Sequence, residues 1–417
     1  MAKWLSRLFR VRAAPYAVGI LASTGSTYVL FLVFSLVSPP DSLGLFALWG
    51  GIVAIFIQFI DGISAQRIAQ GHQDLSTISP LTHGSVNFLN LSRFGVVVIV
   101  GLLTSLMAFI ADPAMTIGVF VMLTGQGAYA LCVSTRVYGP PESLLRLQLF
   151  NCLVYLLVSA GCFLLPEAPS GNLLMILSGV ASLAAALPSL IRDFIDRLRM
   201  DLPLTKELKQ LYLGQSWKHL GSLAAYQAVN AFGGAVDTLL TALGGLRTAA
   251  EYQVVRRPML ALGSLNVAVG QHALNRYAQG STKGWPMALA RLTPVLIAWP
   301  LLGLAGLAVV RWITPDDYDV SILAGILLAT SFALSAFLQI TGTIILVRSH
   351  TFALFVSSLG RILVLVLVAY VAVPSLGVVG IGIAVVLANV FLLAAHLCLL
   401  VFGERGNGRH RKGSSRL

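Results

Sequence analysis

Residues 320–347 read VSILAGILLATSFALSAFLQITGTIILV and contain no charged side chain. An apolar stretch of about 20 residues is long enough to cross the hydrocarbon core of a bilayer as a helix. Similar stretches recur along the 417-residue chain with short polar breaks between them. The chain is 57% hydrophobic and 11% charged, whereas soluble domains are roughly a quarter charged. The sequence therefore predicts an all-α, polytopic membrane protein.

The apolar stretches predict about twelve transmembrane helices in two sets of six. The first set lies at 14–37, 43–65, 93–111, 114–135, 144–165 and 172–192, and the second at 217–243, 250–275, 287–310, 320–347, 351–373 and 377–402. The predicted parts are an N-terminal six-helix lobe at 1–200, an amphipathic bridge at 201–216, a C-terminal lobe at 217–402 and a basic tail at 403–417. Because each lobe has an even number of helices, both lobes begin on the same side, which predicts parallel lobes.

The basic residues decide the predicted orientation. The formal net charge is +12, but the Lys and Arg side chains fall between the apolar stretches, so they form no single patch for nucleic acid. They concentrate in alternate loops, in the bridge and in the tail, while the opposite loops carry chiefly Arg247 and Arg311 beside acids such as Asp316 and Asp317. Short cationic loops stay cytoplasmic. We expect a membrane protein with both termini in the cytoplasm.

Five of the charged residues in the predicted spans stand out, because a charge inside a span costs about 2.5 to 3.5 kcal/mol on insertion scales and needs a partner or a water-filled cavity. They are Asp61, Asp237, Arg256, Arg257 and Arg361. The predicted hairpin of the seventh and eighth helices brings Asp237 level with Arg256 and Arg257, which predicts a buried ion pair. The pair is either a structural clip or a site in which one arginine is paired and the other faces a cavity.

Arg361 and Asp61 lie at different depths. Arg361 is near the middle of the eleventh helix and has no acid one turn away. It either meets an anionic substrate or pairs with helix carbonyls and polar side chains. Asp61 is close to the cytoplasmic end of the second helix, where a charge is held at lower cost, and its role is interpreted as structural.

The seventh helix also carries a polar face. Gln227, Asn230, Gly234 and Asp237 are spaced three, four and three residues apart, so they share one side of a helix. That side either packs against neighbouring helices through hydrogen bonds or lines an aqueous path.

No motif for catalysis, metal or cofactor binding is present. The 4 cysteines and 7 histidines lack metal-ligand spacing, and no Gly-rich loop ending in Lys-Ser or Lys-Thr exists to hold nucleotide phosphates. No large extramembrane segment could form a catalytic domain. We therefore expect neither an enzyme nor a cofactor.

Several motifs resemble those of the multidrug/oligosaccharidyl-lipid/polysaccharide exporter superfamily, and its polysaccharide flippase branch looks most similar. The residues that carry the resemblance are Asp41-Ser-Leu-Gly-Leu-Phe-Ala-Leu, Asp61-Gly-Ile-Ser-Ala-Gln-Arg-Ile-Ala, Asp237-Thr-Leu-Leu, Ala250-Glu-Tyr-Gln-Val-Val-Arg-Arg and Gly377-Val-Val-Gly-Ile-Gly-Ile-Ala. The resemblance implies two lobes around a central cavity and alternating access. It also implies flipping of undecaprenyl-linked oligosaccharides for O-antigen or exopolysaccharide assembly, with membrane lipid around the chain and a polysaccharide polymerase and a chain-length regulator as candidate partners.

By the same resemblance, Arg361, Arg256 and Arg257 are candidate substrate contacts and Asp237 is a candidate ion-pair or coupling residue. As polar residues within the spans, Asn230 and Gln227 are further candidates for substrate contact, and Asp61 is a further candidate for ion pairing or coupling. Two other functions stay open. A cation-coupled multidrug exporter would usually need an acid deep in the first lobe, and the first helix has none. A non-transporting scaffold of a polysaccharide assembly complex is the third reading. Lipid II flipping is a further relative, but that branch typically carries extra helices beyond twelve.

Overall fold

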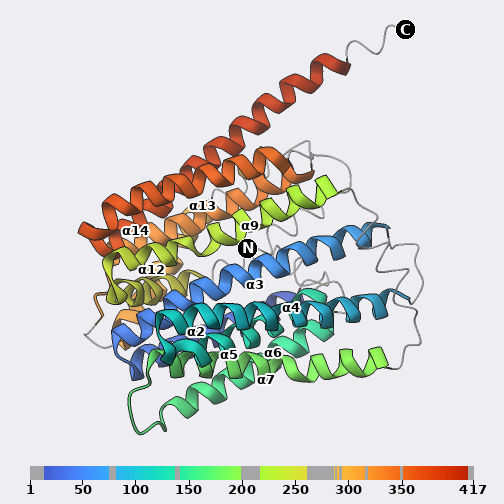
Figure 1. The fold of residues 1–417 in the computed structure, drawn as a ribbon. Helices are drawn as coiled ribbons and strands as arrows, with labels where there is room; N and C mark the ends of the chain where they lie inside the picture. The colour runs from blue at the N-terminus through green and yellow to red at the C-terminus, as the bar shows by residue number, and fades with distance from the viewer. Residues whose placement is uncertain are drawn as a thin grey trace. The chain divides into compact units, whose positions relative to one another are not determined.

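The computed structural model describes residues 14–74, 81–136, 141–198, 217–260, 286, 289–290, 294–314, 318–347 and 351–411. Within these ranges every regular element is a helix, so the predicted all-α fold is confirmed (Figure 1). Among the described residues, seven segments are long and apolar enough to cross a membrane, and two shorter apolar helices accompany them. The chain divides into two compact units, 1–235 and 236–417. The predicted bridge at 201–216 lies outside the described residues.

The N-terminal unit consists of long helices that coincide with the predicted spans. They are α2 (Ala14–Val37), α3 (Pro40–Asp74), α4 (Leu81–Ala111), α5 (Thr116–Arg136), α6 (Pro141–Cys162), α7 (Gly171–Leu198) and most of α9 (Trp217–Leu240). A short 3-10 turn, η2 (Pro113–Met115), joins α4 to α5 and begins after Asp112, whose side chain accepts a hydrogen bond from the Ala114 N–H. Both α3 and α4 extend beyond their predicted apolar stretches.

Small residues bring α5 and α7 into close contact. A side chain at Gly125 would overlap the carbonyl oxygen of Gly179, and a side chain at Gly179 would overlap that of Val121. The two backbones therefore touch directly, as in many helix pairs in membranes, where small residues allow close van der Waals contact. Around this contact the buried side chains include Met122 and Met175, both fully buried.

The C-terminal unit contains the end of α9, the 3-10 turn η3 (Thr241–Gly244), a helix at 246–260, α12 (Val295–Ile313), α13 (Ile322–Val347) and α14 (Thr351–Arg411). Gly245, with φ 90°, separates η3 from the helix at 246–260. Because a positive φ is strained for residues with a Cβ, glycine suits this turn. Side-chain contacts between α9 and 246–260 show that the two helices form a hairpin.

The element α14 consists of two helical arms on either side of Gly377, whose φ of 53° and ψ of −126° are not helical. Arg361 contacts Asn389 across the turn, and a side chain at Gly380 would overlap the carbonyl of Ala372. The arms are therefore antiparallel and correspond to the predicted helices at 351–373 and 377–402. Each of the twelve predicted segments overlaps a helix within the described residues.

Large apolar side chains cover the outside of the helices. Exposed fractions reach 79% at Ile110, 64% at Met107 and 75% at Val371. In water such a surface would be a strong aggregation liability, whereas in a bilayer it contacts lipid tails at no cost. The chain is thus a multi-pass membrane protein.

Candidate functional site

A buried charged network forms around Asp237, near the end of α9. Asp237 is 8% exposed. Its Oδ2 accepts a hydrogen bond from the Tyr252 hydroxyl at 2.7 Å and forms an ion pair with Nη2 of Arg256 at 3.0 Å. Its Oδ1 accepts a hydrogen bond from the Thr238 N–H at 2.7 Å. Both carboxylate oxygens are therefore occupied, as a carboxylate away from water requires.

Thr238 connects the acid to the second helix of the hairpin. Its hydroxyl accepts hydrogen bonds from Nη1 of Arg256 at 2.7 Å and from Nε2 of Gln253 at 2.9 Å. The Arg256 guanidinium thus spans a carboxylate and a hydroxyl, and it also lies 5.5 Å from the centre of the Tyr252 ring, within the range of a cation–π contact. Tyr252 and Arg256 are one helical turn apart, so one face of 246–260 supplies both contacts to α9.

Arg361, in the first arm of α14, adds a second positive charge to the same region. Its Nε donates a hydrogen bond to Oδ1 of Asn389 at 3.0 Å. Asn389, which is 4% exposed, in turn donates from Nδ2 to the carbonyl oxygen of Ser331 at 3.3 Å. The Arg361 charge also interacts electrostatically with Asp237 and Arg256. A neutral amide therefore orients Arg361.

The described part of this network holds more positive than negative charge. Asp237 carries one negative charge, and Arg256 and Arg361 carry one positive charge each. Guanidinium groups present several N–H donors in a plane that matches carboxylate and phosphate oxygens. Chemically, the arrangement can hold one arginine in a structural pair and use the other to bind an anion.

A second polar cluster lies inside the N-terminal unit and is built from neutral groups. The Ser23 hydroxyl of α2 lies 3.0 Å from the Tyr129 hydroxyl of α5 and accepts a hydrogen bond from Nδ2 of Asn151 of α6 at 3.1 Å. Nearby, the Tyr155 and Ser182 hydroxyls lie 2.6 Å apart. These contacts tie α2, α5, α6 and α7 together, because a hydrogen bond in lipid has no competing water.

No family model matches the sequence, and no curated protein is similar to it in sequence. Solved structures do share its fold. The lipid II flippase MurJ, in an inward closed conformation, superposes with a TM-score of 0.70 at 11% identity, covering 92% of this chain and 87% of that one. An outward-facing multidrug resistance MATE family transporter of the MOP superfamily gives 0.59 at 14% identity, covering 97% of each chain.

A third similar structure is a MOP superfamily transporter from Pyrococcus furiosus, whose report describes a binding pocket of reverse polarity. It gives a TM-score of 0.55 at 13% identity and covers 93% of this chain and 94% of its own. The chain shares the fold of these three proteins. These structural neighbours are transporters rather than enzymes. Sequence identities this low show a shared fold and nothing about the branch. The polysaccharide branch is predicted from the sequence motifs alone.

The other predicted residues fall at different places in this fold. Arg257 is half-buried beside Arg256 and has interactions of its own. Asn230 is exposed on α9, in the N-terminal unit. The backbone of Asp61 lies in α3 and that of Gln227 in α9, but the side chains of both are outside the described residues.

Sequence reasoning missed the neutral members of the network. Tyr252 and Gln253 precede Arg256 by four and three residues, which places them on the same face of the helix, and this spacing was the available signal. Asn389 gave no such signal, because it is far from Arg361 in sequence and meets it only through the reversal at Gly377.

Proposed function

We propose that this protein is a flippase that moves undecaprenyl-linked oligosaccharide repeat units across the bacterial inner membrane, by alternating access, for surface polysaccharide assembly. The MOP transporter fold supports transport as the activity class. The motif resemblance described above supports the lipid-linked oligosaccharide as the substrate. Both termini are proposed to be cytoplasmic, as the distribution of Lys and Arg predicts.

The observation that carries the proposal is the positive excess around Asp237. Arg256 is held by the carboxylate at 3.0 Å, whereas Arg361 is oriented by the neutral side chain of Asn389. A charged side chain inside a membrane protein is costly and is a functional candidate by default. A lipid-linked sugar carries its negative charge on the pyrophosphate, whose oxygens suit a guanidinium donor. Arg361 is therefore the proposed contact to the pyrophosphate.

The remaining candidates have supporting roles. Arg256 and Asp237 keep the hairpin of α9 and 246–260 in register, and Arg257 adds positive charge to the same region. Asn230, exposed on α9, and Gln227 are proposed as sugar contacts, since amide groups both donate and accept hydrogen bonds to hydroxyls. Asp61 is proposed as structural.

The alternative function is a cation-coupled multidrug exporter, because several solved neighbours are MATE transporters. A cationic drug would need a negative site, and the described network has a positive excess. A scaffold in a polysaccharide assembly complex, working with a polymerase and a chain-length regulator, would need no anion site at all. The three functions thus predict different consequences when Arg361 is neutralised.

The test deletes the gene in the native host and complements it with wild type, Arg361→Gln or the control Arg247→Gln. Arg247 is 62% exposed and pairs with Glu251, whose side chain is 12% exposed, so its loss removes one charge outside the network. Surface polysaccharide, sensitivity to cationic dyes and protein abundance are measured in each strain.

Flipping predicts that the deletion and Arg361→Gln lose surface polysaccharide at normal protein abundance, while Arg247→Gln restores it. Normal polysaccharide with greater dye sensitivity in the deletion strain would favour drug export. Restoration of polysaccharide by Arg361→Gln, with loss in the deletion strain, would favour the scaffold.

A further inference from the structure

Two arginines, Arg247 and Arg311, depart from the predicted distribution of positive charge, because they lie on the side opposite to the cationic loops. Arg247 has a partner, since its Nε lies 3.0 Å from Oε1 of Glu251. Arg311 is an exposed residue in the last turn of α12. Within the described residues no carboxylate is paired with it.

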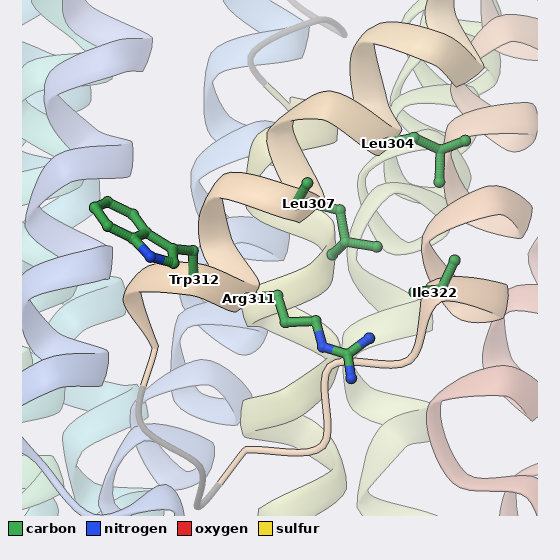
Figure 2. A pocket seen from close by; sticks show the side chains of 6 residues that line it. Leu304, Leu307, Arg311, Trp312 and Ile322 are labelled. Carbon is green, nitrogen blue, oxygen red and sulfur yellow. The ribbon is translucent and has the colours of Figure 1, made fainter.

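Arg311 borders a cavity of about 530 Å³ between the end of α12 and the start of α13. Four of the six residues that line it are aliphatic, namely Leu304, Leu307, Ala308 and Ile322. Figure 2 shows Leu304, Leu307 and Arg311 directed toward the start of α13, where Ile322 lies, with the guanidinium beside the connecting loop. The cavity therefore has an apolar wall along α12 and a positive group at its end.

The depth of this cavity in the membrane follows from its surroundings. Trp312, next to Arg311, is 87% exposed and extends from the other side of α12 (Figure 2). Exposed tryptophans gather at the level of the lipid headgroups. Between two and three turns toward the bilayer centre, Leu301 and Leu302 are 62% and 52% exposed. Arg311 thus sits at the headgroup level and the aliphatic wall at the level of the acyl chains.

We propose that this cavity binds an anionic glycerophospholipid of the outer leaflet, with its phosphate at Arg311 and an acyl chain along Leu304, Leu307 and Ala308. The volume is in the range of small-molecule sites. The positive group lies at the level of the headgroups and the aliphatic wall at the level of the acyl chains, which matches the positions of the phosphate and the chains in a phospholipid. The start of α13, a helix of 26 residues, adds the positive end of its dipole on the same side as the guanidinium. The phosphate would lie beside an arginine on the side of the membrane where the positive-inside pattern disfavours cations.

The experiment titrates full-length, delipidated protein in detergent with phosphatidylglycerol that carries a fluorescent acyl chain. Phosphatidylcholine with the same chain is the zwitterionic comparison, and inorganic phosphate is the competitor. Two pairs of variants are compared. Arg311→Gln is matched by Arg247→Gln, which removes an exposed arginine elsewhere, and Ala308→Trp is matched by Ala305→Trp, which adds the same bulk to α12 at an exposed residue that does not line the cavity.

We expect Arg311→Gln to weaken binding of phosphatidylglycerol about tenfold, because a charge-assisted hydrogen bond to the phosphate is lost. Ala308→Trp should weaken both lipids, since it fills the acyl-chain wall, while the two control variants bind like wild type. Equal effects of Arg311→Gln and Arg247→Gln would overturn the proposal. Displacement of the lipid by millimolar inorganic phosphate would show a site for free anions instead. A change of oligomeric state in Ala308→Trp with unchanged lipid binding would assign the surface to a second copy of the chain.

Discussion

Removing the acid of the Asp237–Arg256 pair should destabilise the C-terminal unit strongly. Asn at position 237 keeps the shape of the side chain but cannot balance the Arg256 charge, and the two side chains are only 11% and 14% exposed. Leaving a buried charge without its partner costs about 3 to 5 kcal/mol. For a unit of this size, 236–417, each 1 kcal/mol corresponds to about 2 to 4 °C in Tm. We therefore expect Asp237→Asn to lower the apparent Tm by about 6 °C or more.

Removing the Arg256 charge as well should restore part of the stability that is lost in Asp237→Asn. In Asp237→Asn/Arg256→Gln no charge is stranded, so the double variant should be more stable than Asp237→Asn alone. Thermal unfolding of the purified protein in detergent, followed by the loss of helical circular dichroism, measures both. An unchanged Tm in Asp237→Asn, or a double variant that melts below the single one, would refute the view that the pair holds the hairpin of α9 and 246–260 together.

Three further outcomes are expected. Gly125→Ala should lower Tm and protein abundance, because its methyl group would overlap the Gly179 backbone. The control Gly161→Ala should be neutral or slightly stabilising, since no atom lies within 4 Å of the added Cβ. Equal effects of the two variants would contradict the close contact of α5 and α7. Tyr252→Phe removes the 2.7 Å hydrogen bond to Asp237 and should lower stability by about 1.5 to 3 kcal/mol, so that Tm falls less than in Asp237→Asn. A fall in Tm as large as that of Asp237→Asn would show that the hydroxyl, and not the charge, contributes most to the stability of the network. A green fluorescent protein fused to the C-terminus should fluoresce and an alkaline phosphatase fusion there should be inactive; the reverse pattern would overturn the predicted topology.

Most of the fold could be predicted because lipid imposes a length on every crossing. The predicted helix at 14–37 has the observed bounds, and that at 351–373 ends at the reversal around Gly377. Helix ends outside the bilayer were harder. The segment predicted at 43–65 belongs to a helix from Pro40 to Asp74, because backbone hydrogen bonding continues after the apolar side chains end, and polar residues such as Gln and Arg are good helix formers.

The site was predictable only where charge marked it. Asp237 and Arg256 were conspicuous because ionised groups inside a span need partners, and the short hairpin limited which partners could reach. The partner of Arg361 was not predictable. Asn389 is a neutral residue on the other arm of α14, and nothing in its local sequence distinguishes it from polar residues that simply pack. Long-range pairing of this kind depends on the reversal at Gly377 and on the register of the two arms.

The central claim is that the positive excess at Arg361 binds the anionic part of a lipid-linked sugar. Purified protein is reconstituted in vesicles that contain a fluorescent undecaprenyl-pyrophosphate oligosaccharide, and the fraction of lipid accessible to an external quencher is followed over time. Asn389→Asp is the decisive variant, because it places a carboxylate where Oδ1 accepts the Arg361 hydrogen bond and so neutralises the excess without changing the shape of the side chain. The account predicts flipping by wild type and at least a tenfold slower rate in Asn389→Asp, compared at equal amounts of folded protein because this variant also loses the Nδ2 hydrogen bond to the Ser331 carbonyl. Flipping by Asn389→Asp at the wild-type rate would contradict it.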